Sequence, residues 1–147
     1  NGDFIPDLAY TATTNSSIEV ALGLDTGGFA PRLTFAVSER PNWIDTGDIN
    51  GDGIMDLATS DFWGKQVAIL IGVGDGTFTR IPDLLASATG SSRIDIADIN
   101  ADGFDDILVA AASGSYLDVF YVVPEPTSST ILLITGMTWI GRSRLSS

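Results

Sequence analysis

The sequence from Asp48 to Leu57 reads DINGDGIMDL, and it returns almost unchanged as DINADGFDDI from Asp98 to Ile107. Each copy crowds several aspartates into one short loop. Like charges at such distances destabilise a fold and raise one another's pKa unless a positive charge lies between them. Because the same crowding occurs twice in the same pattern, the sequence predicts a bound cation in each copy.

Oxygen-bearing groups occupy alternate positions of both copies, which we call loop 2 (residues 48–56) and loop 3 (residues 98–106). Counted from the first aspartate, Asp or Asn stands at positions 1, 3, 5 and 9, glycine at position 6, and a backbone carbonyl is offered at position 7. Hard oxygen ligands at this spacing suit Ca²⁺. The candidate ligands are Asp48, Asn50, Asp52, Ile54 and Asp56 in loop 2, and Asp98, Asn100, Asp102, Phe104 and Asp106 in loop 3.

Two other structures fit parts of this pattern. An EF-hand would carry a bidentate glutamate at position 12, but Thr59 and Val109 stand there, and the residues after both loops favour a strand over a helix. An acidic, Asx-rich turn without any ion is the second alternative. Two copies in register favour Ca²⁺ over an empty turn.

A third, incomplete copy opens the chain and is called loop 1 (residues 1–7). A shift of 49 residues aligns residues 1–3 with residues 50–52. Position 1 of this copy is missing, and Phe4 replaces the glycine at position 6, where a left-handed backbone would cost roughly 1–2 kcal/mol. The weaker ligand candidates of loop 1 are Asn1, Asp3, Ile5 and Asp7.

Each repeat predicts four short strands. In the second repeat we expect them near residues 42–47, 56–61, 66–72 and 77–81, with the acidic loop between the first two and a glycine-rich hairpin turn at residues 72–76. Four strands in a period of 40 to 50 residues are typical of a propeller blade. The expected fold class is therefore all-β, with about two and a half blades of four antiparallel strands.

Composition excludes several classes of function. With 19 acidic and 7 basic residues and a formal net charge of −12, the chain would repel a nucleic acid. Without cysteine it has no thiolate site, and without histidine it has no Ser-His-Asp triad. We expect a protein that is not an enzyme.

Loop 2 followed by VAILIGVGDGTF at residues 67–78 resembles the FG-GAP/VCBS repeat, the blade unit of calcium-binding β-propellers related to integrin α-chains. The resemblance covers roughly residues 1–123. It implies Ca²⁺ loops between the first two strands of each blade, and roles in adhesion, in ligand binding or as accessory repeats on surface proteins. A closed ring usually has four to eight blades, so the resemblance also implies a fragment or one part of a larger assembly.

Residues 124–147 have a different composition: a Pro-Glu-Pro break, an apolar run and then arginines. This order resembles the PEP-CTERM sorting tail of Gram-negative envelope proteins. It implies a transient membrane anchor processed by an exosortase-type enzyme. As a helix, residues 127–141 would span only about 22 Å of a roughly 30 Å hydrocarbon core. The expected sorting-signal residues are Pro124, Glu125, Pro126, Arg142 and Arg144.

The alternative for this segment is that residues 131–135 supply the missing fourth strand of the last blade. Against it, this run does not alternate between apolar and polar residues, and the arginines after it follow the positive-inside rule. These two features favour a short C-terminal apolar helix or tail.

Together these observations predict an exported, calcium-stabilised repeat module that binds or scaffolds at the cell surface or in the extracellular matrix of a Gram-negative-type bacterium. Its ligand would be a surface protein or a polysaccharide. The alternative is a non-catalytic repeat region of a larger envelope-associated hydrolase. A paired-carboxylate glycosidase is less favoured, because every acidic cluster is explained by metal ligation.

Four further residues carry expectations of their own. We expect Trp43, Phe62 and Trp63 to pack between blades rather than form a surface that stacks on sugars. We expect Asp105, an extra acid beside the ligand pattern, to face solvent.

Overall fold

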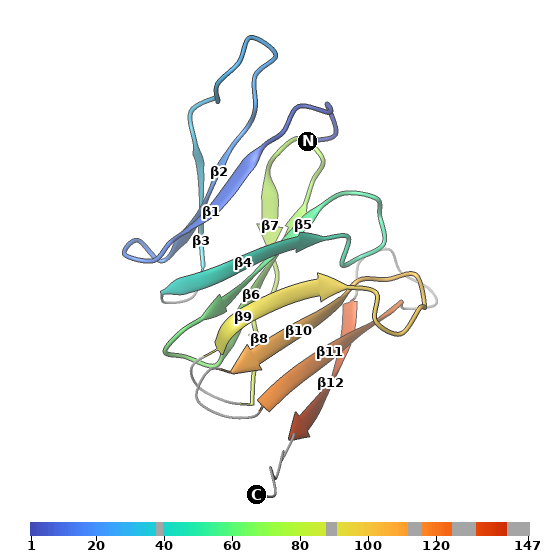
Figure 1. The fold of residues 1–147 in the computed structure, drawn as a ribbon. Helices are drawn as coiled ribbons and strands as arrows, with labels where there is room; N and C mark the ends of the chain where they lie inside the picture. The colour runs from blue at the N-terminus through green and yellow to red at the C-terminus, as the bar shows by residue number, and fades with distance from the viewer. Residues whose placement is uncertain (38–39, 88–90, 112–115, 125–131, 141–147) are drawn as a thin grey trace, which may run out of the picture.

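The structure is a computed structural model that describes residues 1–37, 40–87, 91–111, 116–124 and 132–140. The described residues form twelve strands in three antiparallel sheets, and no helix is present among them. The sheets follow one another along the molecule in chain order (Figure 1). The chain is thus all-β, as predicted, and its sheets are consistent with partial β-propeller blades.

The strands divide cleanly among the three sheets. Sheet 1 has the order β1-β2-β3, with β1 at Leu8–Ala12, β2 at Ser17–Ala21 and β3 at Leu33–Ala36. Sheet 2 has the order β4-β5-β6-β7, with β4 at Pro41–Gly47, β5 at Asp56–Asp61, β6 at Gln66–Gly72 and β7 at Phe78–Arg80, while β8 at Leu84–Leu85 also pairs with β6. Sheet 3 has the order β12-β11-β10-β9, with β9 at Ser91–Ala97, β10 at Asp106–Ala111, β11 at Tyr116–Pro124 and β12 at Leu132–Ile140.

The four strands predicted for the second repeat are confirmed as β4 to β7. The predicted ranges 56–61 and 66–72 coincide with β5 and β6. The predicted range of β4 differs by one residue at its start, and that of β7 by one residue at each end. The fifth strand, β8, was not predicted, because two leucines after a proline carry no periodic pattern.

Strand β6 is an almost continuous apolar run, and both faces of the sheet at this strand are covered. Side chains alternate between the two faces of a strand. Val67 and Ile69 therefore belong to the hydrophobic cluster shared with sheet 3, whereas Ala68 and Leu70 belong to the cluster shared with sheet 1. Because both faces are covered, every one of these side chains is buried.

Two aspartates join sheet 2 to sheet 3. The Ile96 N–H donates to Asp45 Oδ2 (2.8 Å), and the Asp48 N–H donates to Asp105 Oδ2 (2.8 Å). The expectation that Asp105 faces solvent is therefore wrong. Gly47 permits this approach, since a Cβ there would lie 2.7 Å from Asp105 Oδ2. The repeat pattern predicts contacts within one blade, whereas the contact of Asp105 joins two blades.

In sheet 3, β12 pairs with β11 along its length and takes the place of a fourth strand. The sequence favours a helix or tail here over the alternative of a fourth strand at residues 131–135. The expected sorting signal lies largely outside the described residues, which omit 125–131 and 141–147. The sorting tail stays a prediction. No helix in the described segments has the length and apolarity to cross a membrane.

Candidate functional site

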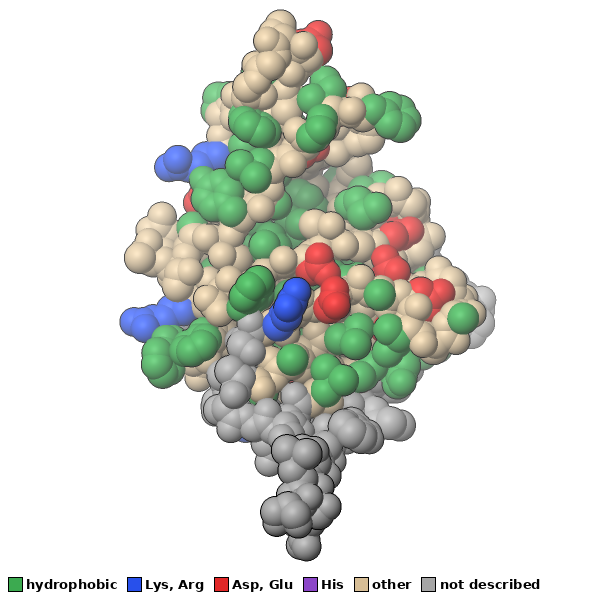
Figure 2. Space-filling view, viewed as in Figure 1, with side chains coloured by type: hydrophobic (Ala, Val, Ile, Leu, Met, Phe, Trp, Pro, Cys, Tyr) green, Lys and Arg blue, Asp and Glu red, His purple; other side chains and the backbone are tan. Residues whose placement is uncertain are grey.

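The three acidic loops lie at equivalent places in the fold. Loop 2 connects β4 to β5, loop 3 connects β9 to β10, and loop 1 leads into β1. In Figure 1 all three lie on the right-hand side of the molecule, where β4 and β9 end. Figure 2 shows several acidic side chains on this side of the same view. The repeated sequence is therefore also repeated in space.

The side chains of loop 2 hold the loop's own backbone. The Asp52 N–H donates to Asp48 Oδ1 (3.0 Å) and to Asn50 Oδ1 (3.0 Å), and the Gly53 N–H donates to Asp48 Oδ2 (2.8 Å). The Ile54 N–H donates to Asp52 Oδ1 (2.8 Å), and the Asn50 amide donates to Asp52 Oδ2 (2.9 Å). Positions 1, 3 and 5 thus face the interior of one tight turn.

Loop 3 repeats this network. Asp98 accepts from the N–H groups of Asp102 (3.2 Å) and Gly103 (2.9 Å), and Asn100 Oδ1 accepts from the Asp102 N–H (2.9 Å). The Phe104 N–H donates to Asp102 Oδ1 (3.0 Å). The spacing predicted from the sequence therefore brings equivalent residues into equivalent contacts.

Loop 1 contains the same network without its first position. The Asp3 N–H donates to Asn1 Oδ1 (3.1 Å), the Ile5 N–H donates to Asp3 Oδ1 (2.8 Å), and the Asn1 amide donates to Asp3 Oδ2 (2.9 Å). The Ile5 N–H is the main reason that the pKa of Asp3 lies below its ordinary value. Loop 1 therefore repeats the contacts that positions 3 and 5 make in the other two loops.

The ninth position has a structural role that the sequence did not reveal. In every loop this aspartate accepts from a backbone N–H at the end of the third strand of the blade, sixteen residues further on. The three contacts are Gly23 N–H to Asp7 Oδ1 (2.8 Å), Gly72 N–H to Asp56 Oδ1 (2.8 Å) and Val122 N–H to Asp106 Oδ1 (3.0 Å). The available signal was the aspartate that recurs at position 9 of every loop, at Asp7, Asp56 and Asp106.

Two positions in each loop have a left-handed backbone. At position 6, φ is 83° at Gly53, 93° at Gly103 and 64° at Phe4. At position 4, φ is 74° at Gly51 but 61° at Ala101. Glycine adopts this conformation without strain, whereas residues with a Cβ do so at a cost. The strain expected at Phe4 is therefore present, and Ala101 adds a second instance.

The chemistry of the donor set fits Ca²⁺. Every candidate side chain offers carboxylate or amide oxygen, and an oxygen that accepts one N–H keeps a second lone pair for a cation. Within the described part of the chain, no three Asp, Glu, His or Cys side chains form a ready metal cluster. A Ca²⁺ ion would therefore also need the Asn50 amide oxygen and the Ile54 carbonyl, as the spacing predicts.

Asp56 is fully buried, with 0% of its surface exposed, as is its equivalent Asp106 in loop 3. Its Oδ2 accepts from the N–H groups of Ile49 (3.0 Å) and Asn50 (3.3 Å). Burial raises the pKa of Asp56 to about 6, although the N–H donors, led by Gly72, oppose this shift. A cation beside this carboxylate would lower its pKa again.

We expect this shift to be measurable in metal-free protein. Between pH 3.8 and about 6, folded Asp56 keeps a proton that the unfolded chain has released. Its contribution to the free energy of unfolding therefore falls as pH rises through this window and is constant above it. Carbon NMR of the carboxyl groups in EGTA should give a midpoint near 6, assigned by its loss in Asp56→Asn. Added Ca²⁺ should move the midpoint down, and a midpoint near 3.8 in EGTA would contradict the effect of burial.

Trp43, Phe62 and Trp63, which were expected to pack between blades, are all partly exposed. Trp63 is 66% exposed, so the expected packing between blades is wrong for most of its surface, and Trp43 is 46% exposed. Trp43 does meet the next blade at one point, where the Arg93 guanidinium lies 5.7 Å from the ring centroid. Phe62 and Trp63 lie together on the β5–β6 turn, away from the acidic loops.

The repeated loops and sheets agree with a comparison against known families. The family described as the FG-GAP-like repeat matches residues 1–59 and 60–109 of this chain. The chain belongs to the FG-GAP-like repeat family. A comparison with curated proteins finds no match. FG-GAP-like repeats are typical of extracellular or surface proteins, and the matched segments contain all three loops.

Proposed function

We propose that this FG-GAP-like chain is a calcium-stabilised repeat module of an exported protein, used for binding or scaffolding at the cell surface or in the extracellular matrix. The observation that carries the proposal is the network of side-chain to backbone hydrogen bonds that recurs in three loops of one family of repeats. A network maintained in three copies is typical of a shared ligand rather than of three unrelated turns.

In this proposal loops 2 and 3 each hold one Ca²⁺ ion, and loop 1 holds one more weakly. The ion would neutralise the three carboxylates of a complete loop and so permit their close approach. It would catalyse nothing, because Asp48 and Asp56 already direct their oxygens to backbone N–H groups of the fold. The proposed ligands are the side-chain oxygens at positions 1, 3, 5 and 9 of each complete loop and the backbone carbonyl at position 7.

The proposal includes sorting by the C-terminal segment. Pro124, Glu125 and Pro126 would mark processing by an exosortase-type enzyme, and Arg142 and Arg144 would retain the apolar segment at the membrane until cleavage. The module would then reach the envelope surface of a Gram-negative-type cell without its tail.

Expression of the chain behind a secretion signal in a host with an exosortase tests this proposal. We expect surface-exposed protein whose intact mass lacks the residues after Pro126. As a matched control, a variant in which Pro124, Glu125 and Pro126 are all alanine should keep its full mass. Surface protein that still contains Arg144, or protein that stays inside the cell in both forms, would refute sorting by this tail.

A further inference from the structure

The β5–β6 turn presents an aromatic pair that the acidic loops do not explain. Phe62 is 36% exposed and Trp63 is 66% exposed. Their rings meet edge to face, with centroids 4.9 Å apart and an interplanar angle of 85°. Two large aromatic side chains in contact with each other at the surface form an apolar patch, and aromatic side chains are enriched at binding surfaces. This pair therefore needs an explanation outside the core.

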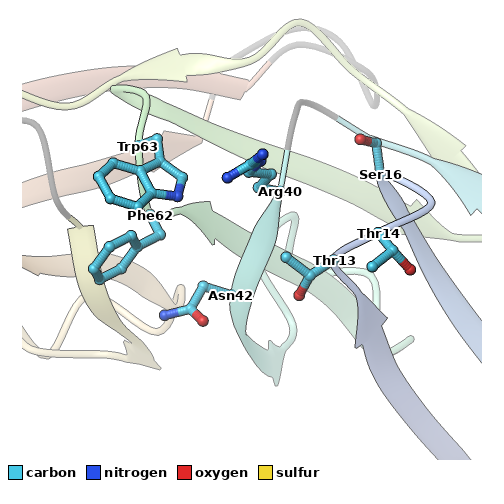
Figure 3. A pocket seen from close by; sticks show the side chains of 7 residues that line it. All are labelled: Thr13, Thr14, Ser16, Arg40, Asn42, Phe62 and Trp63. Atoms are coloured by element: carbon cyan, nitrogen blue, oxygen red, sulfur yellow. The ribbon is translucent and has the colours of Figure 1, made fainter.

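Beside the pair lies a groove of about 690 Å³ between sheets 1 and 2, which is within the usual size of a small-molecule site. Figure 3 shows the two rings on one side and the hydroxyl residues of the β1–β2 turn on the other. Between them lie two side chains from the start of sheet 2. The polar lining residues are Thr13, Thr14, Ser16, Arg40 and Asn42.

Short contacts fix both walls of this groove. The backbone N–H of Trp63 donates to Asp61 Oδ1 (2.8 Å), and Gly64 leaves room for the Asp61 carboxylate, which a Cβ at position 64 would meet. On the other wall, the Thr13 hydroxyl donates to the Pro41 carbonyl (2.8 Å). The backbone of the aromatic turn and the Thr13 side chain are thus held in place before any ligand arrives.

The backbone of the groove is strained at two residues. Ser16 has φ 51° and Arg40 has φ 55°, a left-handed conformation that residues with a Cβ rarely adopt. Such strain is concentrated at binding sites, where the surrounding structure maintains it. Both strained residues line the groove, and they come from neighbouring sheets.

The lining indicates the chemistry of the ligand. It offers hydroxyl groups, one amide and one guanidinium, and the described lining residues include no carboxylate in a chain with 19 acidic residues. A saccharide has an apolar C–H face for the rings and hydroxyls for the polar wall. The net charge of −12 opposes a polyanion.

We propose that the groove between the β1–β2 and β5–β6 turns binds a neutral saccharide, with Trp63 and Phe62 stacked on a sugar ring and Arg40 and Asn42 hydrogen-bonded to its hydroxyls. This inference rests on the proposed function and deepens it, because it names the ligand class of the binding module and places it away from the acidic loops. The site binds and does not cleave.

Isothermal titration calorimetry of the chain in Ca²⁺ tests this inference, because its signal does not depend on Trp63. The probes are oligosaccharides of glucose, mannose and N-acetylglucosamine, and a sulfated oligosaccharide serves as the anionic comparison. We expect a saturable heat change with at least one neutral probe and a weaker response to the sulfated one. Trp63→Ala should weaken binding by at least about tenfold. Trp43→Ala is the matched control, since it removes an exposed tryptophan outside the groove and should leave affinity unchanged.

Melting curves with and without Ca²⁺, recorded on the same samples, show that each variant is folded. Binding that is lost equally in Trp43→Ala and Trp63→Ala, preference for the sulfated probe, or no response to any neutral probe would overturn the saccharide site. If Ca²⁺ raises the melting temperature while no neutral probe binds, the proposed function stands and this inference fails. If a neutral probe binds through Trp63 while Ca²⁺ has no effect on melting, the role of calcium fails instead.

Discussion

In excess EGTA we expect the melting temperature of this FG-GAP-like chain to fall by roughly 15 °C from its value in saturating Ca²⁺. Loops 2 and 3 each contain three carboxylates that we propose as ligands, and without a cation these would repel one another across one tight turn. An ion at a hundredfold excess over its Kd stabilises the folded state by about 2.7 kcal/mol per site. Two such sites together would contribute a large share of the stability of a small domain.

Variants separate an effect of the loops from a general effect of the ion. Asp52→Ala combined with Asp102→Ala should reproduce most of the loss and make the melting curve insensitive to EGTA. The matched control is Asp25→Ala, which removes an exposed aspartate outside the three loops and should keep the full response to Ca²⁺. Mg²⁺ should restore little, because it prefers smaller octahedral shells and retains its waters. A melting curve that EGTA leaves unchanged would mean that hydrogen bonds alone hold the loops.

The sequence predicted the elements within one blade because their signals are local and repeated. The apolar run of β6 is long enough to identify a strand, and the acidic loop fixes the strands on either side. The repeated glycine at position 6 likewise indicated the left-handed backbone, and Phe4 was recognised as strained for that reason. Because each repeat carries the same local signals, the strands and loops of a repeat protein can be predicted from the period of its sequence.

Contacts between blades could not be predicted in the same way. Asp105 binds the backbone of loop 2, whereas Met55, its equivalent in the previous repeat, is exposed. The period predicts where equivalent residues lie within each blade. It does not specify which groups of the neighbouring blade contact them. An acid that appears in only one copy, as Asp105 does, was the signal for a contact specific to that copy.

The aromatic groove escaped prediction for a related reason. Phe62 and Trp63 were expected between blades because large aromatic side chains usually supply core packing. The Asp61 carboxylate and Gly64 instead form a tight turn that holds both rings at the surface. Turn geometry, rather than hydrophobicity, decided their exposure.

Asp56→Ala should be the most damaging single substitution among the loop aspartates, with an expected loss of roughly 3–5 kcal/mol in the free energy of unfolding. The buried carboxylate accepts from the N–H groups of Ile49, Asn50 and Gly72, and alanine would leave these donors without an acceptor where water cannot replace it. The bond to Gly72 also joins the start of β5 to the end of β6, so its loss should loosen the whole of sheet 2.

Asp7→Ala provides the matched comparison, because it removes the same bond at the same loop position. Asp7 accepts from the Gly23 N–H at 2.8 Å, as Asp56 does from Gly72, but its side chain is 24% exposed. Water can therefore satisfy the freed donor, and the loss should be about 1 kcal/mol or less. Urea unfolding of both variants in EGTA excludes any contribution from a bound ion. Equal losses in the two variants would show that burial does not set the cost, and that the ninth aspartate acts mainly as a metal ligand.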